Sequence, residues 1–285
     1  MAITRASFDE IIERVHTIPS LPEVVTQVCR LVNDPDANAS MISNIMIRDA
    51  AMSAKMLRMV NSVYYGLKEP VADLEQATII MGFKTIRSVA LSISVISAFQ
   101  QQNACFNMKA FWMHSAVSAC LCKMIAEKAQ LCDPGTAYTM GLLKDIGKLV
   151  LVENAPDETR AIVAVAREYK LSFNAASREV LDTDDAEIAG WLAQKWELDP
   201  LIIETLRYQY DITKGVQMPL VAMCLFSEYL CALKKIRVSG NCDEPSLDPV
   251  VWQHLGLDKN ALVDLLTRVN DEVDNARQLM AMAGN

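Results

Sequence analysis

The chain has 285 residues, of which 52% are hydrophobic and 22% charged, and its formal net charge is -8 at pH 7. This length and apolar content suffice for one or two domains with a large buried core. Nucleic acid is not expected as a partner, because binding it requires clustered Lys and Arg side chains, whereas the charge here is acidic and no part of the chain is a basic tail.

The N-terminal residues predict a chain outside the membrane. Residues 1–10 become acidic before any apolar run develops, which argues against a secretory signal. The longest apolar stretch, 89–99, contains three serines and is too short to cross a bilayer. We therefore expect a cytoplasmic protein that does not use a membrane as a partner.

Apolar residues recur at spacings of three and four while alternation with period two never persists, so the sequence predicts an all-α fold. An N-terminal helical subdomain is expected over 1–103. Its first helix follows a capping box of Ser7 and Glu10, and Ser40 is expected to cap a later, short helix. The other helices expected here span about 22–32, 51–60, 74–81 and 84–99, with a loop over 61–70.

A second helical unit is expected over 104–212, after the polar break at 100–103, and a C-terminal helical extension over 213–285 is expected to pack on it. The final helix is expected to start at the cap Asn260, with Leu262, Leu266, Val269 and Val273 on one face. The remaining expected helices span 108–129, 135–152, 156–169, 175–181, 186–196, 200–208 and 219–235.

Few residues suggest chemistry directly. The eight cysteines show no C-x-x-C spacing and are expected to be small buried hydrophobes without a zinc or redox role. Of the three histidines, His16 and His254 are expected to be structural or solvated, and His114 alone reads most simply as a packed helix residue. The sequence contains no nucleophile elbow, P-loop or G-x-G-x-x-G, so no cofactor is expected.

The informative segment is Thr139–Val150, where Lys144 and Asp145 are charges within an apolar pattern. Burying a charge is costly unless it is paired, so these side chains are expected at a polar site. With Gly141 and Gly147, the segment resembles the G-L-L-H-D-I-G element of the HD superfamily, with Lys at the histidine position.

Further motifs resemble the HDOD family, a signalling offshoot of the HD phosphohydrolases. They are Ile18–Val25, similar to the family's P-x-L-P-x-V opening, Arg48–Gly66, similar to its D-P-x-L-T-x-x-L-L-x-x-x-N-S-x-Y-Y-G block, Ala77–Gly82, similar to A-x-x-x-L-G, and Trp112–Ser115, which matches W-x-H-S. The resemblance covers about residues 15–212 and implies an HD-phosphohydrolase-like helical core.

In an active HD hydrolase, His and Asp ligands hold a metal whose bound water attacks phosphorus. Position by position, the resemblance places His114 at the first His and Asp145 at the doublet Asp, with Lys144 at the doublet His. Asp185 stands at a downstream His, and Gln209 and Tyr210 replace a His-His pair. The resemblance thus implies a degenerate site with no catalytic residues and no metal, although weak divalent binding by His114, Asp145 and Asp185 stays open.

Two interpretations of Lys144 follow. Its ammonium could stand where the metal would sit, balanced by Asp145 and Asp185, or it could form an ordinary ion pair without inherited geometry. The loop residues Asn61, Ser62, Tyr64, Tyr65 and Gly66 could form a recognition loop or buttress the junction between the N-terminal helices and the core, and we favour buttressing.

The resemblance favours a noncatalytic regulatory and interaction module of bacterial signal transduction, whose signalling-protein partners are unidentified, rather than an enzyme. One alternative is a divergent metal-dependent phosphohydrolase acting on cyclic dinucleotides or nucleotides. Another is a domain that senses a nucleotide ligand without hydrolysing it. The basic residues that could serve that sensing role, and that more simply solvate helix surfaces, are Arg48, Lys55, Arg58, Lys84 and Arg87.

Overall fold

The computed structural model of the chain describes residues 6–15, 20–99, 106–214 and 217–283. In these ranges every regular secondary-structure element is a helix, which confirms the all-α prediction. An isolated β-bridge joins Ala6 and Leu181. The expected role of His16, the break at 100–103 and Cys105 lie outside the described residues.

The helices follow one another with short connections. They are α1 (Phe8–Glu13), α2 (Glu23–Leu31), α3 (Ala39–Met46), α4 (Ala50–Val60), the 3-10 turn η1 (Val63–Tyr65), α5 (Leu74–Met81), α6 (Phe83–Ala98), α7 (Met108–Ala129), α8 (Pro134–Leu143), α9 (Ile146–Asn154), α10 (Pro156–Tyr169), α11 (Phe173–Val180), α12 (Asp185–Lys195), α13 (Pro200–Tyr208), α14 (Met218–Leu233), α15 (Pro249–Leu255) and α16 (Lys259–Ala283).

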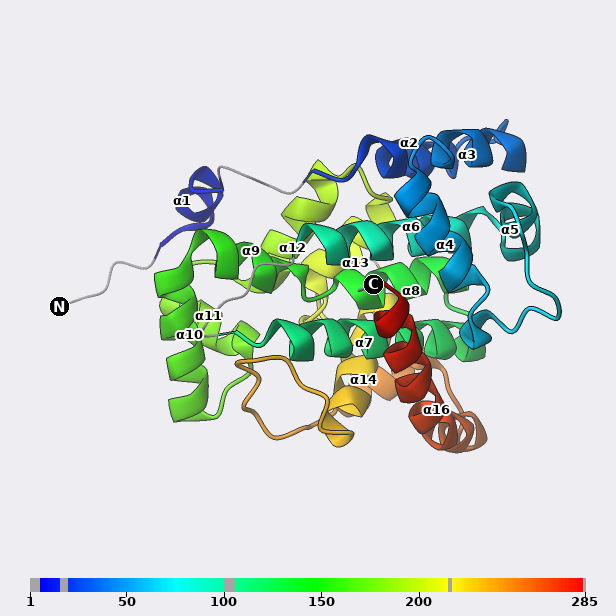
Figure 1. Cartoon of the computed structure of the whole chain (residues 1–285). Coiled ribbons are helices and arrows are strands. Elements are labelled where there is room, and N and C mark those ends of the chain that lie inside the picture. The colour runs from blue at the N-terminus through cyan, green and yellow to red at the C-terminus, as the bar shows by residue number, and fades with distance from the viewer. Residues whose placement is uncertain (1–5, 16–19, 100–105, 215–216, 284–285) are drawn as a thin grey trace.

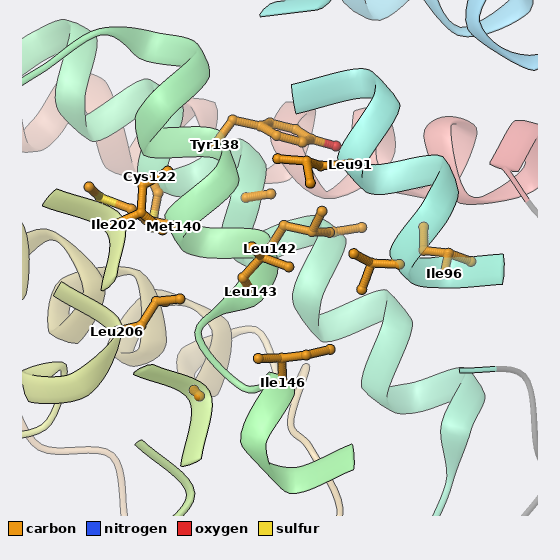
Figure 2. Packing of buried hydrophobic residues seen from close by; sticks show 14 of the residues in the cluster. Leu91, Ile96, Cys122, Tyr138, Met140, Leu142, Leu143, Ile146, Ile202 and Leu206 are labelled. Atoms are coloured by element: carbon orange, nitrogen blue, oxygen red, sulfur yellow. The ribbon is translucent and has the colours of Figure 1, made fainter. Parts of the chain in front are cut away.

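Helix α7 is the centre of the molecule, with α8, α14 and α16 packed around it (Figure 1). Its residues between Phe111 and Ala126 are almost all buried, as expected for a helix that is apolar on most of its circumference. Figure 2 shows how α6, α7, α8, α9 and α13 contribute to one continuous core. The residues labelled there are Leu91, Ile96, Cys122, Tyr138, Met140, Leu142, Leu143, Ile146, Ile202 and Leu206.

The N-terminal helices α2 to α5 gather at one side of this core, where α2, α4 and α5 contact α6 (Figure 1). Helix α1 lies elsewhere, because Arg14 pairs with Glu158 of α10 and the Asp182 amide donates to the Ala6 carbonyl at 3.0 Å. Helix α16 returns from the C-terminal region to contact α4 as well as α7. Contacts therefore cross both predicted domain boundaries, at 103 and 212, and these boundaries remain predictions.

Two predicted caps were wrong and one was confirmed. The box of Ser7 and Glu10 is present at α1. At α3 the cap is Asn38 and not Ser40, because the Asn38 side chain accepts from the Met41 amide at 3.0 Å. At α16 the Asp258 carboxylate accepts from the Ala261 amide at 2.7 Å, and Asn260 lies inside the helix. In both cases the cap is a polar residue two positions before the predicted one, and its side chain accepts from a free amide of the first helical turn.

The predicted inner face of the last helix contains one error. Val269 and Val273 are buried, but Leu266 is 42% exposed while Leu265 is fully buried. Spacings of three and four residues both fit a helical stripe, so the local pattern admits either leucine. The packing of α16 against α7 selects Leu265.

The cysteines of the described residues are free thiols and most of them are buried, as expected for small hydrophobes.

Of the described helices, none alone is long and apolar enough to cross a membrane. Helices α5 and α6 meet that criterion only as a pair, and they are bent by 119° at their junction.

Candidate functional site

A break between α8 and α9 creates the candidate site, where the sequence predicts one helix over 135–152. The helix ends at Leu143 and restarts at Ile146, so that Lys144 and Asp145 lie at the break. Both side chains are buried, with exposed fractions of 1% and 0%. The single-helix prediction was wrong because the apolar pattern continues through the break.

Two glycines bring the neighbouring helices close to this break. A Cβ atom on Gly141 would lie 2.5 Å from the Ser118 carbonyl oxygen of α7, and one on Gly147 would lie 1.9 Å from the Asp185 carbonyl oxygen of α12. Only glycine permits such an approach of two backbones. The glycines of the motif therefore allow α7 and α12 to bring His114 and Asp185 into the neighbourhood of Lys144 and Asp145.

The Lys144 ammonium is surrounded by three polar side chains. Its Nζ atom lies 2.6 Å from Asp145 Oδ2, 2.5 Å from Glu228 Oε2 and 3.2 Å from His114 Nε2. The other ring nitrogen of His114 donates to the Ile236 carbonyl at 3.0 Å, which fixes the orientation of the ring. Lys144 thus joins α7, the α8–α9 break and α14.

A second buried lysine, Lys148, completes the site on its other side. Its ammonium donates to Asp145 Oδ1 and lies 3.7 Å from Asp185 Oδ2. Tyr210 Oη lies 3.3 Å from an oxygen of each of these two carboxylates, and Asn174 donates to Asp185 Oδ1 at 2.9 Å. Asp185 therefore balances Lys148, and the expectation that it balances Lys144 finds no support in these contacts.

Gln209, expected at the degenerate site, has a structural role in the backbone around the break. Its Nε2 atom donates to the carbonyls of Lys144, at 2.5 Å, and Leu206, at 2.9 Å. It thereby satisfies a carbonyl that the end of α8 leaves without a helical partner.

The charges at the site stabilise one another. Burial lowers the pKa of the Lys144 ammonium, but Asp145 and Glu228 raise it well above its usual range. Burial raises the pKa of Asp145, yet Lys144 and Lys148 hold it well below its usual value. Burial and the Lys144 ammonium lower the pKa of His114, but Glu228 and Asp145 raise it to about 9. His114 is therefore a cation at neutral pH, and the two cations Lys144 and His114 share the carboxylates of Asp145 and Glu228.

Neighbouring charges offset the effect of burial on the pKa of Lys148 fully, but on that of Asp185 only in part. Burial lowers the pKa of Lys148, but Asp145 and Asp185 raise it above its usual value. Burial raises the pKa of Asp185, which Lys148 only partly opposes.

A metal does not fit this arrangement while Lys144 is in place. His114, Asp145 and Glu228 offer ligand atoms that lie within 4.8 Å of one another, the spacing of a metal-binding group. The Lys144 Nζ atom lies 2.5 to 3.2 Å from one atom of each of these residues, so it occupies the space that an ion would need. A protonated amine has no lone pair and cannot be a ligand.

The sequence-based site was incomplete by two residues, Lys148 and Glu228. Each carried a signal, because Lys148 is a further charge in the apolar segment and Glu228 is the single charged residue of α14. Their partners are far away in sequence, so the signal showed that each needs a partner but not which one it has. The pattern therefore missed Glu228 as the carboxylate opposite Lys144, a place it gave to Asp185.

The motif loop lies at the junction between the N-terminal helices and the core. Asn61 donates to the Val71 carbonyl at 2.9 Å and accepts from the Val71 amide at 2.8 Å. The rings of Tyr64 and Tyr65 pack edge to face, and the Lys123 ammonium lies 4.5 Å from the Tyr64 ring centre. These contacts fit the buttressing interpretation. Ser62 is also buried, and Gly66 ends the turn with φ +61°.

The five basic residues considered for a nucleotide differ in exposure. Arg87 is buried and donates to Thr136 Oγ1 at 3.2 Å, so it has a structural role between α6 and α8. Arg48, Arg58 and Lys84 are exposed on helix surfaces or at helix ends. A nucleotide ligand remains an untested prediction.

Comparison with known proteins agrees with the motifs. The HDOD domain family matches residues 18–212. An uncharacterized protein of Treponema pallidum (strain Nichols) is 23% identical over 223 residues, which are 76% of this chain and 42% of that protein, so the chain spans less than half the length of this relative.

Solved structures resemble the fold. An HDOD domain protein of unknown function from Geobacter sulfurreducens has a TM-score of 0.82 at 24% identity, covering 95% of this chain and 96% of that one. A Shewanella amazonensis SB2B protein, provisionally named a phosphohydrolase, has a TM-score of 0.69 at 22% identity, with 94% and 97% covered. A Marinobacter aquaeolei VT8 protein, provisionally named a signal transduction protein, has a TM-score of 0.77 at 18% identity, with 97% and 61% covered. The family match extends over most of the chain and includes the motifs around His114 and Lys144, so the chain belongs to the HDOD family.

Proposed function

We propose that this chain is a noncatalytic regulatory module of bacterial signal transduction, which acts in the cytoplasm by binding other proteins. The observation that supports this proposal is the position of the Lys144 ammonium among His114, Asp145 and Glu228. Metal-assisted hydrolysis needs an ion that acidifies a bound water, and the ammonium lies where that ion would bind.

The Lys144 side chain keeps its charge and its position, so it does not free the space that a metal ion would need. The carboxylates of Asp145 and Glu228 hold the pKa of Lys144 well above its usual range, so the ammonium stays charged at neutral pH. An ion could enter only if the whole side chain left its buried position, which would separate it from two carboxylates. Removing one cation from such a cluster of buried charges is strongly unfavourable.

A signalling role draws on family membership and on the name of the Marinobacter protein. A phosphohydrolase role, suggested by the name of the Shewanella protein, is the alternative. The experiment must distinguish it from a signalling role. Shared fold does not decide between them, because function depends on the site.

The test compares the wild type with Lys144→His and Lys144→Gln. Metal content after purification in the presence of Mn2+ and Zn2+, and turnover of cyclic dinucleotides and nucleotides, are measured for each protein. The wild type should hold no stoichiometric metal and show no turnover. Lys144→His should gain metal, because it replaces the ammonium with a ligand beside three others, and Lys144→Gln, which removes the charge without adding an imidazole, is the matched control.

Stoichiometric metal in the wild type, together with turnover that Asp145→Ala abolishes, would overturn the proposal. A second experiment identifies the protein partner by crosslinking the wild-type chain in cells and then measuring its binding to the purified crosslinked protein. Failure to find a protein that binds reproducibly and saturably would also contradict the proposal.

A further inference from the structure

A cavity of about 310 Å3 lies beside the buried charges, between α14, α15 and the connecting segment 234–248. Its volume is at the lower end of the range for small-molecule sites. Glu228 and Tyr210 line it from the side of the charge cluster, and Leu225, Ile212 and Val251 are among its apolar lining residues. The cavity therefore gives solvent-side access to a carboxylate of the cluster.

Glu228 has room for one more hydrogen bond on the cavity side. Its Oε2 atom interacts with Lys144 at 2.5 Å and His114 at 3.0 Å, and its Oε1 atom accepts from Asn241 at 3.0 Å. A carboxylate offers about four acceptor positions. The side chain is 22% exposed and lines the cavity.

The charges of the cavity lining favour a positive ligand. The lining contains three carboxylates, from Glu228, Asp243 and Asp248, and one guanidinium, from Arg237. That guanidinium donates to the Asp243 carbonyl at 2.6 Å and to Asp243 Oδ1 at 2.9 Å, while its Nε atom has no hydrogen-bond partner among the described residues. The lining itself thus contains more carboxylates than cations, while Lys144 and His114 contact Glu228 from behind it. The net charge of the whole chain, -8, adds a long-range attraction for cations.

We propose that this cavity binds a small organic cation, an ammonium or guanidinium group on a compact apolar body. The head group donates to the free acceptor position of Glu228, and the body packs against Leu225, Ile212 and Val251. A phosphate or carboxylate ligand is disfavoured, because it would meet the three carboxylates of the lining. This binding role is separate from the proposed protein-binding role and does not depend on it.

Ligand binding at this place would also act on segment 234–248. Asn241 of that segment bonds Glu228, and the Ile236 carbonyl accepts from His114. A head group beside Glu228 is therefore in reach of the contacts that hold the segment over the site.

The experiment uses three probes of matched shape and different charge on the full-length chain at neutral pH. Benzylammonium, benzyl alcohol and benzoate are titrated by calorimetry and by protein-observed NMR. Benzylammonium should bind about tenfold more tightly than benzyl alcohol, which is what one charge-assisted hydrogen bond contributes, and benzoate should bind more weakly than the alcohol. Equal affinities, a preference for benzoate, or no binding of any probe would overturn the proposal.

Two variants separate the head group from the body. Glu228→Gln keeps the shape of the side chain and should remove the preference for the cation. Because that change also touches the charge cluster, Ala232→Leu serves as the second variant. It fills space in the cavity lining without removing a charge, and should weaken all three probes together. Unchanged cation binding in Ala232→Leu, with NMR shifts away from α14 and segment 234–248, would place binding elsewhere and refute the inference.

Discussion

The charge of His114 should make the protein less stable as the pH rises from about 6 to about 8.5. The pKa of His114 is raised from 6.5 to about 9 in the folded state. A raised pKa means that the folded protein holds the proton more tightly than the unfolded chain. The resulting stabilisation is complete below the unfolded pKa of 6.5 and is lost as the pH rises through 9.

The size of this effect follows from the two pKa values. A shift from 6.5 to about 9 corresponds to about 3 kcal/mol in total, of which about 2 kcal/mol is lost between about pH 6 and about pH 8.5. The range stops there because burial raises the pKa of Cys29 to about 11. Above its ordinary pKa, such a thiol ionises in the unfolded chain and adds a second loss of stability.

Urea unfolding followed by circular dichroism at a series of pH values measures the loss. His114→Gln is the control, since an amide can donate to the Ile236 carbonyl but does not titrate. The free energy of unfolding of the wild type should fall by about 2 kcal/mol more than that of the variant over this interval. Parallel pH profiles for the two proteins would refute the assignment of a buried imidazolium.

Three further substitutions test the packing and pairing of the site by urea unfolding. Lys144→Met should cost about 3 to 5 kcal/mol by removing a buried cation from Asp145 and Glu228, and adding Glu228→Gln should recover part of that loss, whereas strict additivity would contradict the pairing. Gly147→Ala should cost about 3 kcal/mol because its Cβ would clash with the Asp185 backbone, and a neutral result would mean that α9 and α12 are further apart. Asn61→Ala should cost about 2 kcal/mol by leaving two backbone groups of the loop unsatisfied, and a change below about 0.5 kcal/mol would disprove the buttressing role.

Much of the local structure was predictable from the sequence. The helix over Met108–Ala129 has the bounds that the pattern predicts, and the Ser7 capping box is present. Helix periodicity and capping depend on residues within a few positions of one another, so a local reading captures them. The two cap predictions were wrong although capping is also local, because several neighbouring polar residues can accept from the same amides.

The candidate site was predictable only in part. The motif identified Lys144 and Asp145, and it placed His114 and Asp185 in the same region, but Lys144 pairs with Glu228, 84 residues away, and Asp185 pairs with Lys148. A charge in an apolar segment reveals that a partner is required, because an unpaired buried charge is too costly. Which partner it receives depends on which helices approach each other.

The sequence alone therefore determined the helical class, the family and the residues that needed partners. The tertiary structure decided that α8 and α9 separate at Lys144, that α14 brings Glu228 to the site, and that the ammonium lies among the would-be metal ligands. The physical reason is range: hydrogen bonds and periodicity along a helix act between residues a few positions apart, whereas the positions of buried charges are decided by packing between distant segments.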